Sequence, residues 1–200
     1  MCAAVLAMVV RTMTLIRVVP ALLLLLFISA PVATADPIPD TRQAHVRILD
    51  RHLRTLFEEG LRDSPTLRAL VSRLEASDVV VYLQPDPFGS PAFAGRTTLL
   101  SVVGDTRYMV IRLTPLPSDV QQLGMVGHEL QHAVEVAERR DIVDEDSMYR
   151  EYARLGYMSA MTGSGVAFET REATDVGTRV SEEMRSAASA SDGHVSSGSD

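Results

Sequence analysis

Val126-Gly127-His128-Glu129-Leu130-Gln131-His132 is the stretch of this 200-residue chain from which its fold and chemistry are inferred. It is an HExxH motif, and the apolar residues around it predict a helix over 118–138 with Ser118 as its N-terminal cap. Residues four apart lie on one helix face, so the rings of His128 and His132 can reach a single ion. Glu129 stands beside the first histidine, where its carboxylate can take a proton from a zinc-bound water. The motif therefore predicts a Zn²⁺ site that supports hydrolysis.

A catalytic zinc takes three protein ligands and a water, so one more ligand is required. The longer motif, with a glycine and a third histidine further along the helix, is absent because Glu135 and Glu138 stand at those positions. A helix predicted over 167–185 offers two carboxylates instead. At about 100° per residue, Glu169 falls on the apolar face of that helix and Glu172 falls toward its edge.

A carboxylate on an apolar helix face needs a partner or a metal. Glu169 is therefore predicted to be the third ligand, with Glu172 as the alternative. The interpretation without a metal is that both are solvated acids near a helix N-terminus, where the helix dipole favours them.

The segments around the motif predict an α+β fold with about three strands packed on the motif helix and further helices. With its HExxH motif, this layout resembles a small zincin-like domain. Gly104-Asp105 separates two of the strands and predicts a hairpin. In chain order we expect a helix over 41–60 capped by Asp40, a helix that starts at Ser64-Pro65, strands over 78–84, 96–103 and 107–113, the motif helix, and helices over 144–155 and 167–185.

The N-terminus has the three parts of a secretory signal peptide, in the usual order. Arg11 and Arg17 are cationic, residues 20–30 are almost entirely apolar, and Ala33-Thr34-Ala35 matches a small-residue cleavage site. Met13 begins a more conventional signal than the first residue does. We expect a signal peptide over 1–35 and an exported bacterial protein of the periplasm or the medium; an uncleaved segment would be a membrane anchor.

Composition restricts the remaining possibilities. The formal net charge is −7, without a basic stripe, which speaks against nucleic acid as a partner. Cys2 is the single cysteine, so the predicted domain over 36–187 has neither a thiol nucleophile nor a cysteine-ligated metal. Residues 188–200 are small and polar, which predicts a disordered tail.

The motif and the later acid together resemble the gluzincin group of zinc metallopeptidases, over about 118–185. His128, Glu129 and His132 match the active-site helix of that group, and Glu169 with Ala173 is similar to its separate glutamate helix. The resemblance is nearer to small, minimal gluzincins and to the membrane-associated peptidases of this group than to thermolysin, which has an aspartate where Ala173 stands. It implies that the two histidines and Glu169 bind Zn²⁺, that Glu129 is the general base, and that the substrate is a peptide or protein.

The resemblance also implies an oxyanion donor and a strand that aligns the substrate. Tyr149, Tyr152 and Tyr157 are candidates for the donor, although simple packing would explain each of them as well. Strand 107–113 could align an extended peptide at the edge of the sheet, or it could be a plain core strand.

Two functions of different classes therefore remain open. The first is an exported zinc metallopeptidase in which Glu129 activates water against a peptide carbonyl. The second is a non-catalytic envelope protein, with a structural or vestigial metal site, that acts as an interaction module. In either case the membrane is a partner only through an uncleaved signal segment.

Overall fold

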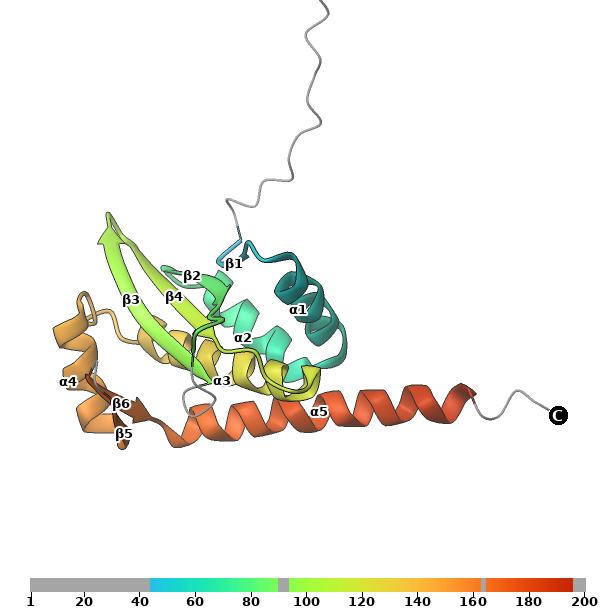
Figure 1. The fold of residues 1–200 in the computed structure, drawn as a ribbon. Helices are drawn as coiled ribbons and strands as arrows, with labels where there is room; N and C mark the ends of the chain where they lie inside the picture. The colour runs from blue at the N-terminus through green and yellow to red at the C-terminus, as the bar shows by residue number, and fades with distance from the viewer. Residues whose placement is uncertain (1–43, 90–93, 163–164, 196–200) are drawn as a thin grey trace, which may run out of the picture. The chain divides into compact units, whose positions relative to one another are not determined.

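The computed structural model describes residues 44–89, 94–162 and 165–195 (Figure 1). The predicted signal segment, Met13 and Asp40 lie outside these residues. Among the residues described, no helix has the length and the apolar character needed to cross a membrane.

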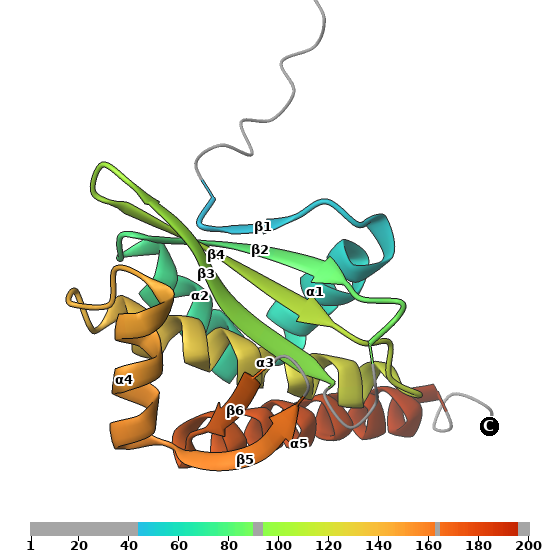
Figure 2. The ribbon, with the colours of Figure 1, turned by 60° about the vertical axis from the view of Figure 1, so that its left-hand side comes forward.

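The described part of the chain has an α+β fold with a four-stranded mixed sheet, a two-stranded sheet and five helices. The larger sheet has the strand order β1-β2-β4-β3, and α1, α2 and α3 lie on one of its faces (Figure 2). The elements in chain order are β1 (Val46–Ile48), α1 (Arg51–Asp63), α2 (Pro65–Glu75), β2 (Val79–Pro85), β3 (Gly95–Val103), β4 (Thr106–Leu113), α3 (Asp119–Ala137), α4 (Glu145–Leu155), β5 (Tyr157–Thr162), β6 (Gly165–Glu169) and α5 (Arg171–Val195).

Several predicted elements are confirmed together with their local causes. Ser64 accepts a hydrogen bond from the backbone of Leu67 and so caps α2, and Ser118 caps α3 in the same way. The strands β3 and β4 pair antiparallel as a hairpin. Gly104 takes a φ of 58° in its turn, a left-handed conformation that glycine adopts without strain.

The prediction for the first segment is wrong. Residues 46–48 form strand β1, which pairs parallel with β2, and α1 begins only at Arg51. Asp50 caps this helix by accepting a hydrogen bond from Leu53 at 2.8 Å. A strand of three residues carries too little periodicity to be recognised, and its pairing partner lies far along the chain. The sheet consequently has four strands rather than three.

The prediction for the last helix also needs correction. Glu169 is the final residue of β6, in a hairpin with β5 that was not predicted, and α5 starts at Arg171. The helix then continues to Val195, so it extends into the segment 188–200 for which a disordered tail was expected.

The role suggested for residues 107–113 as a sheet edge is wrong as well. These residues belong to β4, which pairs with β2 on one side and with β3 on the other. Both sides of the β4 backbone are therefore occupied. In the described sheet, β3 is the edge on that side.

The C-terminal end of α3 is anchored by a buried arginine. Arg107, 2% exposed, donates to both carboxylate oxygens of Asp78 at 2.7 and 3.0 Å. It also donates to the carbonyl oxygens of Val136 at 2.7 Å and Arg139 at 2.6 Å. Carbonyl groups at a helix end have no partner within the helix, so the guanidinium satisfies them and complements the helix dipole. The sheet thereby fixes the position of the motif helix.

We expect Asp78→Asn to lower the free energy of unfolding by about 1–3 kcal/mol at neutral pH, because a buried guanidinium loses its charged partner. Hydrogen bonding to Arg107 lowers the pKa of Asp78 below its ordinary 3.8. The contribution of the Asp78 carboxylate to the free energy of unfolding is therefore complete above pH 3.8, and it is lost as the pH falls through the lowered pKa. In urea unfolding, the difference between the variant and the wild type should shrink as the pH falls below 3.8. Asp175→Asn, at an exposed position of α5, is the control. An Asp78→Asn protein as stable as the wild type at neutral pH would refute this role for Asp78.

Candidate metal centre

Helices α3 and α5 approach each other closely because glycines face the partner helix where they pack. A Cβ atom on Gly177 would lie 2.9 Å from the carbonyl oxygen of Gly124 and 3.1 Å from Cβ of His128. A Cβ atom on Gly127 would lie 2.7 Å from a methyl group of Val180. Backbone therefore packs against backbone, and α5 runs along α3 beside the first histidine of the motif (Figures 1 and 2).

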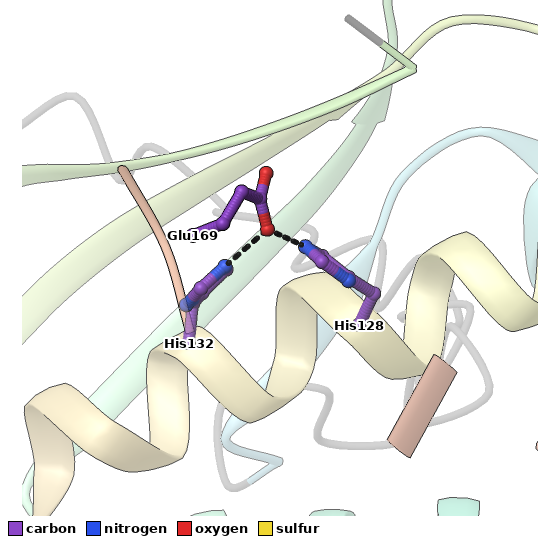
Figure 3. A group of neighbouring side chains, drawn as sticks. All are labelled: His128, His132 and Glu169. Atoms are coloured by element: carbon purple, nitrogen blue, oxygen red, sulfur yellow. Dashed lines mark ion pairs between the residues drawn. The ribbon is translucent and has the colours of Figure 1, made fainter. Parts of the chain in front are cut away.

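This packing brings His128, His132 and Glu169 together (Figure 3). One ligand atom from each lies within 4.8 Å of the others. Oε2 of Glu169 is 2.8 Å from Nε2 of His128 and 3.7 Å from Nε2 of His132. Zinc bonds of about 2.0–2.1 Å in a tetrahedron place two ligands roughly 3.3 Å apart, between these two distances. The cluster could hold a metal ion.

The carboxylate of Glu169 provides a test of whether a cation fits. Its Oε2 atom is buried, and although Nε2 of His128 lies only 2.8 Å away, no donor among the described residues meets it with the geometry of a hydrogen bond. A buried oxygen without a hydrogen bond is costly, and a cation between the two imidazoles would satisfy it. The residues present therefore fit a metal ion.

The carboxylates of the cluster favour a positive charge between the two imidazoles, either a proton or a metal ion. Burial acts to raise the pKa of Glu169, but His128 and His132 outweigh it and lower this pKa to about 2. Burial acts to lower the pKa of His132, but Glu135 and Glu169 outweigh it and raise this pKa to about 10. In the absence of an ion, the cluster thus retains a proton that a metal must displace, which makes metal binding pH-dependent.

Glu129 lies next to the ligand cluster, against strand β3. It is 4% exposed and accepts a hydrogen bond from the Thr97 hydroxyl at 2.6 Å. A Cβ atom at Gly95 would overlap Oε1 of Glu129, so a side chain at position 95 would displace this carboxylate. Burial raises the pKa of Glu129, although the Thr97 hydroxyl and the two imidazoles of the motif oppose this. A raised pKa suits a group that takes up a proton near neutral pH.

A second group of residues supports His132. Its Nδ1 atom is 2.9 Å from Oε2 of Glu135, and the buried Tyr152 hydroxyl donates toward the same oxygen at 3.1 Å. The Thr170 hydroxyl donates to Oε1 of Glu135 at 2.7 Å. In the sequence, Glu135 is notable only as a departure from the longer motif. Its spacing of three residues from His132 is a usable signal, whereas nothing local indicated Thr170.

The other predicted site residues have different surroundings. Glu172 is exposed in the first turn of α5 and does not belong to the cluster. Tyr152 directs its hydroxyl to Glu135 and the His132 carbonyl, so it supports a histidine instead of acting as an oxyanion donor. Tyr149 is 52% exposed and its ring contacts Phe168 edge-on. The side chain of Tyr157 lies outside the described part of the chain.

A groove of about 570 Å³ lies beside the cluster. His128 and Glu169 contribute to its lining, so the cluster is within reach of a molecule bound there. The rest of the lining combines apolar residues and glycines with hydroxyl groups, one amide and one guanidinium: Ala94, Leu116, Pro117, Gln121, Gly124, Met125, Thr174, Gly177, Thr178, Ser181 and Arg185.

Comparison of the chain with protein-family models, with curated proteins and with solved structures finds no match. The resemblance to gluzincins therefore rests on the motif and on the later acid alone. It stays a prediction.

We expect Gly177→Ala to destabilise the fold, although alanine favours helix by about 1 kcal/mol. The added methyl group meets backbone of α3, and overpacking of this kind costs about 1–3 kcal/mol. Thermal unfolding of metal-free protein measures the effect, with Thr178→Ala at the adjacent exposed position as control. A stability equal to or above that of the wild type would show that the helices can separate without cost.

Glu169→Ala should lower zinc affinity by at least about 100-fold, because losing a ligand costs more than losing a ligand's hydrogen-bond partner. Glu172→Ala is the matched control, three residues away and exposed. Both are measured by chelator competition, together with elemental analysis of the purified proteins. Unchanged zinc binding in Glu169→Ala would remove this residue from the ligand set.

Proposed function

We propose that this protein is a zinc-dependent metallopeptidase in which His128, His132 and Glu169 hold the ion. The proposal is carried by one observation, the convergence of three ligand atoms beside a separate, buried acid whose pKa is raised. Two imidazole nitrogens and a carboxylate form a donor set that suits catalytic zinc. The same donor set serves iron oxygenases, but these have no need of a proton acceptor placed as Glu129 is.

Zinc bound at this site supplies a water of lowered pKa and polarises the carbonyl of the substrate. Glu129 accepts the proton of the attacking water and returns it to the departing nitrogen of the peptide bond. The Thr97 hydroxyl holds the carboxylate through a 2.6 Å hydrogen bond, so that it keeps one orientation through both transfers. Because burial raises the pKa of Glu129, the carboxylate takes up the proton of the water more readily than an exposed carboxylate would.

An extended peptide or protein segment is the proposed substrate. Strand β3 lies at an edge of the larger sheet and carries Gly95 and Thr97, both in contact with Glu129. A peptide that pairs with the β3 backbone would pass over this carboxylate, and the adjacent groove offers space for its side chains. Export through the segment 1–35 is part of the same proposal.

A second candidate is a non-catalytic envelope protein that acts as an interaction module. The observation that favours it is the apolar end of the β3–β4 hairpin, where Leu100, Val102 and Val103 are 54%, 38% and 63% exposed. Exposed apolar side chains that are grouped in this way are typical of contact surfaces. In that case the metal site would be structural or vestigial.

Glu129→Gln should lower kcat/KM for peptide cleavage by about 10²–10⁴-fold, because the amide cannot accept the proton. Zinc content should stay near that of the wild type, since Glu129 is not among the three ligand residues. A labelled, denatured protein is the substrate, and Glu138→Gln, 61% exposed near the end of the same helix, is the control.

Cleavage by Glu129→Gln at the wild-type rate would overturn the peptidase proposal. A wild-type protein that binds zinc but cleaves no unfolded substrate would favour the interaction module.

A further inference from the structure

Glu135 has more partners than the proposed chemistry uses. Both of its oxygens accept hydrogen bonds, and its side chain is 18% exposed. The donors come from three places in the fold: His132 from α3, Tyr152 from α4, and Thr170 from the junction of β6 and α5. This one carboxylate therefore joins the motif helix to the segment that carries the third ligand.

The first consequence concerns the ring of His132. A carboxylate only accepts hydrogen bonds, so the 2.9 Å contact with Glu135 places a proton on Nδ1. Nε2 is then the nitrogen that offers its lone pair to a metal, on the side where Glu169 lies. Edge contacts with His128 at 4.9 Å and Tyr152 at 5.5 Å between ring centroids hold the plane of the ring.

The second consequence concerns Glu169. The next residue, Thr170, is 8% exposed, and its hydroxyl donates to Glu135 at 2.7 Å. The same hydroxyl accepts a hydrogen bond from the backbone of Ala173 at 3.1 Å, as a helix cap does. The backbone beside Glu169 is thus tied to the motif helix through Glu135.

We propose that Glu135 is a positioning residue that couples two of the three metal ligands, because it holds the His132 ring directly and the Glu169 backbone through Thr170. The ligands are then in place before an ion arrives. This inference rests on the metal-binding part of the proposed function and is independent of peptide cleavage.

The first test measures Zn²⁺ affinity by chelator competition. Glu135→Ala should weaken binding by about 10–100-fold, as is usual when a ligand histidine loses its hydrogen-bond partner. Glu138→Ala, exposed near the end of the same helix, should bind like the wild type. Equal affinity of Glu135→Ala and wild type would overturn the inference. A wild-type protein that binds no zinc would instead overturn the metal site itself.

The second test measures coupling. Thr170→Val removes the hydroxyl, whereas Thr170→Ser keeps it, so only the valine variant should lose Zn²⁺ affinity. This pair also tests the inference if Glu135→Ala does not fold. In a double-mutant cycle, the Glu135→Ala/Thr170→Val protein should show a fold-loss in Zn²⁺ affinity smaller than the product of the fold-losses of the two single variants. Multiplicative losses would show that the two residues act independently.

The third test separates positioning from general stabilisation. In Co²⁺-loaded protein, the Nδ1 proton of His132 gives a paramagnetically shifted proton resonance that persists only while a hydrogen bond slows its exchange with water. The resonance should be present in the wild type and in Glu138→Ala, and absent in Glu135→Ala. A resonance retained in Glu135→Ala would overturn the assignment, even if that variant were less stable.

Discussion

The close approach of α3 and α5 is the constraint on which the site depends. His128 and Glu169 are distant in sequence, and they meet only because Gly124 and Gly177 let the two helix backbones come together. The glycine contact alone would not fix the position of α3 along its own axis. Arg107 fixes this position, because it links the C-terminal end of α3 to the sheet. The glycine contact with α5 and the Arg107 guanidinium at the C-terminal end of α3 together fix the position of the two histidines along the helix axis, relative to Glu169.

Once these backbones are fixed, charge determines what the site can hold. Three carboxylates, those of Glu129, Glu135 and Glu169, surround two imidazoles in a largely buried region. So much negative charge at low dielectric requires compensation, and the raised pKa of His132 shows one source of it, a retained proton. A divalent cation compensates more charge from a single position. Protons and metal ions are therefore alternative ligands of the same cluster.

The sequence predicted the parts of this arrangement that depend on local chemistry. The HExxH spacing, the Ser118 cap and the turn at Gly104 each follow from a few adjacent residues, and the structure contains the corresponding helix and hairpin. The helical phase that favours Glu169 as a ligand does not apply, since this residue ends strand β6. Glu169 nevertheless belongs to the cluster, because a carboxylate in an apolar context needs a partner in a strand as much as in a helix. Strand β1 and the hydrogen bond from Thr170 to Glu135 depend on partners that are distant in the sequence, so no local sequence pattern predicts either of them.

The surroundings of Glu129 bear most directly on the choice between an enzyme and a scaffold. A structural metal site needs its ligands and their supports, which His128, His132, Glu169 and Glu135 already provide. Burying another carboxylate beside them costs free energy, and its raised pKa is a measure of that cost. Position 95 is a glycine, and a Cβ atom there would overlap Oε1 of this carboxylate and displace it. Residues held in costly, raised-pKa environments occur preferentially where protons are transferred. The arrangement around Glu129 therefore favours the proposed catalytic role over a purely structural metal site.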